Sequence, residues 1–261
     1  CSKFDANLSV EIRVISTGFS YGYRQDNHKQ GCCMQQVRAR AANPTSLIQD
    51  VNELRLSPVV HLLTGEIVNL VAETPRAFDD RVSFGANNLF ISRISPAIWL
   101  AHHVETSAMM AIDSQSTARP IIISAPISAM MHPDTPMACE AAAARSKLCP
   151  QEICIEVEDA TLYQSKAEVM RSIKALRQRG FRVSVNATRS WCTPMDTDMR
   201  LLLDCVRIDA NKIWVESDLL NRIEAASACG MGVIAENARY RDGEKLAGVG
   251  IELARAPKVD A

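Results

Sequence analysis

Polar and charged side chains stand at the ends of several short apolar runs in the second half of the chain. They are Ser124, Glu156, Glu158, Asn186, Arg207, Asp209 and Glu236. Carboxylate, amide and hydroxyl oxygens are suitable ligands for a hard divalent cation. The same groups could instead pair with one another, with Arg207 bound to Asp209 or Glu236. The residue types alone leave a metal or ligand site and a cluster of structural salt bridges equally open.

The runs that carry these side chains predict buried parallel strands. Each run is about five residues long and rich in Val and Ile, as is typical of strands covered on both faces. The predicted strands are 120–124, 153–158, 181–186, 205–209 and 232–236. Helical segments are expected before and between them, at 97–112, 136–147, 162–179, 194–203 and 215–229.

The repeated order of strand and helix predicts right-handed βαβ units and a parallel sheet. Upstream, residues 53–63 and 66–72 flank the turn signal Thr64-Gly65 and are expected to form a hairpin. A hairpin followed by about six such units favours an α/β fold of the TIM-like (β/α)8 type with an antiparallel opening strand. The C-terminal ends of barrel strands meet at one mouth, so the polar strand ends are expected to converge there.

The composition and charge of the chain argue against several classes of protein. The 261 residues carry 29 Lys and Arg against 30 Asp and Glu, which argues against a nucleic-acid or anionic membrane surface. No apolar run approaches the roughly 20 residues of a membrane span. The nine cysteines lack metal-ligand spacing and are expected to be reduced thiols of a cytoplasmic protein. Because the chain begins at Cys1, we expect a fragment or processed product, which leaves open a membrane anchor in the full-length protein.

A domain boundary is predicted near 43–46, at the Asn43-Pro44 break. Residues 1–45 would be an N-terminal strand and helix, or the tail of a preceding domain, and 46–261 would form the barrel.

The sequence also predicts the environment of two histidines and one tryptophan. His102 and His103 adjoin on a predicted helix and point in different directions, so both are expected at the surface rather than as a chelating pair. Trp191 fits an exposed interaction anchor and a buried ring equally well.

Five segments, in order and in register, resemble the EAL domain, the bacterial fold that hydrolyses cyclic di-GMP. Residues 53–68 (ELRLSPVVHLLTGEIV) are similar to the family's opening ELRLxxQPIVDLxTGxIV. The others are ICIEVED (153–159), like ELEITE; GFRVSVNATR (180–189), like GxRLALDDFG; VRID (206–209), like LKID; and GVIAE (232–236), like LxVVAEGVE. The resemblance covers about residues 46–257 and implies an EAL-type barrel.

The resemblance implies a site in which carboxylates and an asparagine hold two divalent metals, and this chain departs from that pattern. The family's first glutamate falls on Val71, and Glu73, two residues on, is displaced by about 7 Å. Ser124 replaces the asparagine and Arg207 the lysine. The remaining departures are Asn186 and Ala187 for the paired aspartates, Arg239 for the second glutamate of AEGVE, and a position near Gly250 for the closing glutamine.

Of the family's metal-facing residues only Glu156 and Glu236 remain, with Asp209 as a structural partner. We therefore expect no catalytic residues and no metal cofactor, the Mg or Mn site of the family being lost. The expected function is a regulatory or protein-interaction module in bacterial cyclic di-GMP signalling, which controls motility and biofilms, with a regulatory protein as partner. The alternatives are a non-hydrolysing cyclic di-GMP receptor that uses Arg207 and Arg239, and, less favoured, an active phosphodiesterase that uses Glu73.

Two further expectations rest on resemblance alone. EAL-type barrels often pair through a helix and loop near the mouth, which implies a possible homodimer. Residues 14–19 (VISTGF) are faintly similar to a strand near the end of GGDEF domains, which implies a degenerate GGDEF tail as one identity for residues 1–45.

Overall fold

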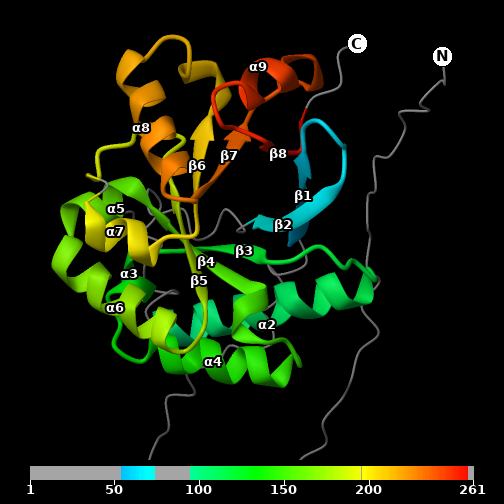
Figure 1. Ribbon diagram of the computed structural model, residues 1–261. Coiled ribbons are helices and arrows are strands. Elements are labelled where there is room, and N and C mark those ends of the chain that lie inside the picture. Colours follow the sequence, from blue (N-terminus) through cyan, green and yellow to red (C-terminus); the bar gives the residue numbers. More distant parts are fainter. Residues whose placement is uncertain (1–53, 74–94, 195, 258–261) are drawn as a thin grey trace, which may run out of the picture. The chain divides into compact units, whose positions relative to one another are not determined.

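The computed structural model describes residues 54–73, 95–194 and 196–257 (Figure 1). All of them belong to the second of the two compact units into which the chain divides, Glu53–Ala261. The expected strand and helix within 1–45, and the faint GGDEF resemblance there, lie outside the described residues. The boundary near 43–46 therefore stays a prediction.

In the described part of the chain, eight strands close into a barrel in the order in which they occur in the sequence. They are β1 (Arg55–His61), β2 (Ile67–Glu73), β3 (Ile121–Ala125), β4 (Ile153–Glu158), β5 (Arg182–Asn186), β6 (Cys205–Asp209), β7 (Gly232–Glu236) and β8 (Leu253–Arg255). Strand β1 runs antiparallel to both β2 and β8, and every other neighbouring pair is parallel. The predicted TIM-like barrel with an antiparallel opening strand is confirmed. Because β1 is reversed, its first residues lie at the same mouth as the last residues of the other strands.

Helices lie around the outside of the barrel (Figure 1). They are α2 (Pro96–Asp113), α3 (Ile127–Met130), α4 (Thr135–Arg145), α5 (Asp159–Gln164), α6 (Lys166–Gln178), α7 (Thr197–Leu202), α8 (Ser217–Ala228) and α9 (Gly243–Ala247), with 3-10 turns η4 (Pro150–Glu152), η5 (Ala210–Lys212) and η6 (Tyr240–Asp242). The expected single helix over 162–179 is wrong. It is two helices that meet at Ser165, whose φ of −126° is not helical. The Ser165 amide bonds to the Thr161 carbonyl, so α5 ends there, and the Ser165 carbonyl accepts the amide of Val169 as α6 begins.

The alternation of side chains along each strand divides the apolar core into two layers. Outward-facing residues such as Ile121, Ile123 and Ile155 are fully buried under the helices. Inward-facing residues form a smaller cluster that fills the barrel, namely Val59, Val71, Ile122, Cys154 and Ile234. The next inward-facing residue toward the mouth, two positions away, is polar on all five of these strands: Ser57, Glu73, Ser124, Glu156 and Glu236. An apolar plug therefore supports a polar layer directly above it.

Among the described helices, none has the length and apolar character needed to cross a membrane.

Candidate functional site

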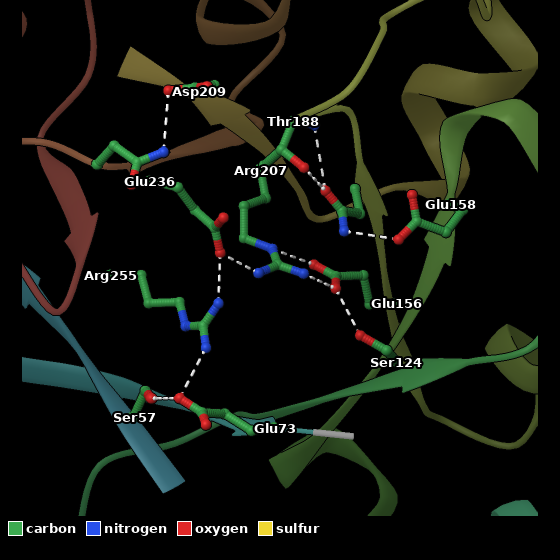
Figure 2. A network of polar contacts seen from close by, with 12 residues as sticks. Ser57, Glu73, Ser124, Glu156, Glu158, Thr188, Arg207, Asp209, Glu236 and Arg255 are labelled. Carbon is green, nitrogen blue, oxygen red and sulfur yellow. Dashed lines mark hydrogen bonds and ion pairs between the residues drawn. The ribbon is translucent and has the colours of Figure 1, made fainter. Parts of the chain in front are cut away.

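The strand register brings the predicted polar strand ends together at one mouth. Ser124 lies beside Glu156 on the neighbouring strand, Asn186 beside Arg207, and Asp209 beside Glu236. Figure 2 shows that the side chains of Ser124, Glu156, Arg207 and Glu236 point toward one another across the end of the barrel. The expectation that they converge is confirmed.

Arg207 lies at the centre of the site. Its Nε donates to Oε1 of Glu156 at 2.9 Å, its Nη2 donates to Oε2 of the same carboxylate, and its Nη1 donates to Oε1 of Glu236. The Arg207 side chain is only 6% exposed and that of Glu156 only 1%. Burial alone would lower the pKa of Arg207, but the charges of Glu156 and Glu236 outweigh it and raise the pKa above its ordinary value. Arg207 is therefore permanently charged between two carboxylates.

A second arginine extends the contacts around the mouth. Arg255 Nη1 donates to Oε1 of Glu236 at 2.5 Å, and its Nη2 donates to Oε1 of Glu73 at 3.0 Å. The hydroxyl of Ser57 donates to the same Glu73 oxygen at 2.5 Å, and at the other end Ser124 donates to Oε2 of Glu156 at 2.8 Å. We call this set the mouth network: Ser57, Glu73, Ser124, Glu156, Arg207, Glu236 and Arg255. It joins side chains from seven of the eight barrel strands.

Glu236 connects the two arginines, because one of its oxygens accepts a hydrogen bond from each of them. Burial would raise the pKa of this carboxyl, but the charges of Arg207 and Arg255 and their hydrogen bonds hold it below its ordinary value. Glu236 is therefore ionised at neutral pH.

The remaining strand, β5, is tied to the mouth through Glu158. Asn186 Nδ2 donates to Oε1 of Glu158 at 2.8 Å, and Asn186 Oδ1 accepts from the amide of Thr188 at 3.1 Å and from its hydroxyl at 2.7 Å. Burial, followed by the charge of Glu156, raises the pKa of Glu158. Asn186 thus fixes the start of the loop after β5 rather than facing a free ligand position.

Two of the predicted site residues lie apart from Arg207. Asp209 accepts hydrogen bonds from the amide of Asn211 at 3.0 Å and from Nδ2 of Asn237 at 3.2 Å, so the suggested Arg207–Asp209 pair is wrong and the Arg207–Glu236 pair is right. Asp209 lies two residues farther along the strand, where it stabilises the turn η5. Arg239 is exposed and directly precedes η6.

Sequence reasoning missed one charged member of the mouth network, Arg255. It considered Glu73, which follows Val71 by two residues and so faces the same way in the strand, only as the carboxylate of the less favoured phosphodiesterase alternative. Arg255 ends a strand of only three residues, which has too little pattern to be recognised. The family's closing glutamine was expected near Gly250, but Gly250 lies in the turn between α9 and β8, and it is Arg255 that enters the mouth.

The predictions for His102, His103 and Trp191 have different outcomes. His102 is exposed as predicted, but His103 is 4% exposed and stacks on Trp99 with 5.3 Å between ring centroids, so its predicted surface position is wrong. The helix turns this second histidine onto the face of α2 that packs inward. For Trp191 the buried alternative holds, since the residue is 9% exposed.

The loop after β5, which carries Trp191, is held by a buried carboxylate. Asp159 is 1% exposed and accepts the backbone amides of Cys192 at 2.6 Å and Thr193 at 3.0 Å. Among the described residues, no three or more His, Cys, Asp and Glu side chains are arranged to hold a metal ion.

Comparisons with known proteins show a similarity of fold. No protein-family model and no curated protein matches the sequence. Among solved structures, the phosphodiesterase PaMucR in complex with c-di-GMP has 16% identity and a TM-score of 0.61, over 81% of this chain and 92% of its own. BlrP1 of Klebsiella pneumoniae, solved with calcium and cyclic di-GMP, has 16% identity and a TM-score of 0.62, over 77% of this chain and 53% of its own.

The EAL enzyme Bd1971 in its cGMP-bound form has 15% identity and a TM-score of 0.63, over 82% of this chain and 65% of its own. The chain therefore spans about half to two thirds of the length of BlrP1 and Bd1971. Identities of this size establish architecture rather than activity. The closed barrel with its reversed first strand, the order of its elements and these structural matches together show that the described residues, 54–73, 95–194 and 196–257, have the EAL-type TIM-like fold.

Proposed function

We propose that this EAL-type barrel does not hydrolyse cyclic di-GMP and acts as a regulatory, protein-interaction module in bacterial cyclic di-GMP signalling. One observation carries the proposal: the guanidinium of Arg207 binds both Glu156 and Glu236. These are the two carboxylates that the EAL resemblance leaves in place of a full metal-binding set.

The residues of the mouth do not fit a pair of divalent cations. Both oxygens of Glu156 and one oxygen of Glu236 already accept hydrogen bonds from Arg207. A cation on the same carboxylates would lie close to a guanidinium and be repelled by it, strongly so in a buried site. Val71, at the family's first glutamate position, is 2% exposed within the apolar plug and offers no ligand atom.

The charge of the mouth network also argues against the receptor alternative. Three carboxylates, Glu73, Glu156 and Glu236, face two guanidiniums, Arg207 and Arg255, which leaves a net charge of about −1 if all five are ionised. Both guanidiniums are bound to carboxylates, whereas an arginine that recognises a phosphodiester must direct its N–H groups at the ligand. Cyclic di-GMP carries two phosphodiester charges and would be repelled.

A protein partner finds a more suitable surface beside the mouth. The segment that follows β6 exposes Trp214 by 46% and Val215 by 82%, and Tyr240 after β7 is 41% exposed. Lys245 lies 3.9 Å from the centroid of the Trp214 ring. Exposed aromatic residues are frequent anchors of protein interfaces. This surface supports the interaction module over a nucleotide receptor.

Hydrolysis is the decisive test. The purified chain is incubated with cyclic di-GMP and Mn²⁺ or Mg²⁺, and the linear dinucleotide is followed by chromatography, with a catalytically active EAL phosphodiesterase as positive control. We expect no product above the protein-free blank, both for the chain as it is and for Arg207→Lys, because the lysine does not supply the missing ligands. Metal-dependent turnover by the unmodified chain would refute the proposal.

Calorimetry and a cellular assay separate the two remaining functions. Titration with cyclic di-GMP should give no heat up to high micromolar ligand, and saturable binding would favour the receptor.

In the source bacterium, a Trp214→Ala, Val215→Ser chain should fail to restore the motility or biofilm phenotype of a deletion strain while cellular cyclic di-GMP stays unchanged. Leu201→Ser, which also removes an exposed apolar side chain (73% exposed) but from α7, is the matched control and should restore it.

A further inference from the structure

We infer that Arg207 and Arg255 are built-in counter-ions of the barrel mouth, so that its carboxylates are held together by the chain itself and need no bound cation. The inference concerns how the mouth is stabilised, and it stands whether or not the protein-interaction function proposed above is right.

The charges of the mouth network alternate along one continuous path. Glu156 binds Arg207, Arg207 binds Glu236, Glu236 binds Arg255, and Arg255 binds Glu73. The path runs through strands β4, β6, β7, β8 and β2, and a serine hydroxyl closes each end. Each guanidinium thus separates two carboxylates that would otherwise repel each other.

The guanidinium of Arg207 has a geometry that can bind two carboxylates at once, and the carboxylate beside it, Glu156, is deeply buried. A guanidinium is planar and presents its N–H groups in a fixed fork, so one side chain binds Glu156 with two of them and Glu236 with a third. Glu156 is 1% exposed and lies directly above the apolar plug. An ionised carboxylate buried to this degree without a counter-ion is strongly unfavourable. An ionised Glu156 therefore needs a cation against it, and in this chain that cation is Arg207.

Burial decreases along the path toward β2. The side chains of Arg255 and Glu236 are 21% exposed and that of Glu73 is 40% exposed. Solvent screens the outer pairs more strongly than the inner one. The contribution to stability is therefore concentrated at Arg207, which makes this residue the one to test.

The experiment compares melting temperatures in EDTA and in 1 mM Mn²⁺ for three proteins. They are the unmodified chain, Arg207→Met, which keeps the length of the stem and removes the charge, and Arg177→Met as the control. Arg177 forms a short but more exposed pair with Asp204 at 2.5 Å, next to the first residue of β6 and hence at the opposite end of the barrel. The metal alone is the probe, so no nucleotide is needed.

The unmodified chain and Arg177→Met should each melt at the same temperature in EDTA and in Mn²⁺. Arg207→Met should melt lower than Arg177→Met in EDTA, and Mn²⁺ should raise its melting temperature by about 2 °C or more, because Glu156 then lacks a counter-ion, Glu236 keeps only Arg255, and the metal supplies the missing charge. Electron paramagnetic resonance should show Mn²⁺ bound by this variant and not by the unmodified chain.

Two results would overturn the inference: a melting temperature of the unmodified chain that depends on Mn²⁺ or EDTA, or an Arg207→Met chain that is as stable as the control in EDTA. If Arg207→Met does not fold, Arg207→Lys replaces it. This variant keeps the charge but cannot reach both carboxylates with a fork, so it should fold, melt below the unmodified chain in EDTA and, because its ammonium still repels the metal, gain no stability from Mn²⁺. An Arg207→Lys chain that melts like the unmodified chain, or that Mn²⁺ stabilises, also overturns the inference, and none of these results depends on whether cyclic di-GMP is hydrolysed.

Discussion

At the scale of single residues, the arginine at position 207 determines which ligands the carboxylates of the barrel mouth can bind. The sequence predicts that Arg207, Glu156 and Glu236 meet, because all three end strands that converge. It could not decide between Asp209 and Glu236 as the partner of Arg207, since Asp209 ends the strand that carries Arg207 and Glu236 ends the neighbouring strand. In the structure the partner is Glu236. Asp209 lies two residues beyond Arg207 on β6, where its carboxylate accepts hydrogen bonds from Asn211 and Asn237 instead.

His103 shows how a single buried side chain makes stability depend on pH. Burial, and to a lesser extent the neighbouring His102, lowers its pKa from 6.5 to about 4. The unfolded chain therefore binds a proton near pH 6.5 that the folded chain does not bind until about pH 4. The stability that neutral His103 supports is fully present above pH 6.5 and is lost as the pH falls toward 4, by about 3 kcal/mol in all.

Chemical denaturation between pH 7.5 and 4 should reveal this loss. His103→Phe, which keeps a ring to stack on Trp99, should remove most of this part of the acid dependence, whereas the exposed His102→Gln should change it little. If His103→Phe loses as much stability on acidification as the unmodified chain, the histidine is not the cause.

At the scale of elements, the loops at the mouth depend on contacts that no local pattern reveals. The parallel strands β3 to β7 were predicted to within one residue, because their Val and Ile runs are strong signals. The division of 162–179 into α5 and α6 was not predicted, because the residues on either side of Ser165 are good helix formers and the break is set at that one residue. The same applies to the loop between β5 and α7, whose support comes from Asp159, more than 30 residues away in the chain.

Replacing Asp159 tests this support. Asp159→Ala removes the acceptor of two backbone amides, those of Cys192 and Thr193, and should lower the free energy of unfolding by about 2–3 kcal/mol. Asp159→Asn, whose side-chain oxygen can still accept one of them, should have a smaller effect. Denaturation in urea measures both.

Asp218→Ala is the matched control for Asp159. Its side chain is 75% exposed and pairs with Arg222 one helical turn away, so the change should stay within about 0.5 kcal/mol. Equal effects of Asp159→Ala and Asp218→Ala would show that the loop does not depend on the buried carboxylate.

At the scale of the whole molecule, closure of the barrel depends on the element that is hardest to see in the sequence. β8 has three residues, yet it pairs with β1 on one side and β7 on the other and supplies Arg255 to the mouth network. The sequence predicted a closed barrel from the number of strand–helix repeats. It could not identify the residues that close it, because three residues contain no usable periodicity.

Truncation before β8 is therefore expected to cost the chain its cooperative fold. A chain that ends at Glu252 leaves β1 and β7 as open edges, and it leaves Glu73 without a cation and Glu236 with only Arg207. We expect loss of the near-ultraviolet circular dichroism and of a single sharp melting transition. A chain that ends at Pro257 keeps every described strand and should melt like the full chain. Should the chain that ends at Glu252 also melt sharply within a few degrees of it, the barrel would not need its eighth strand, and closure would have to be carried by the other seven and their helices.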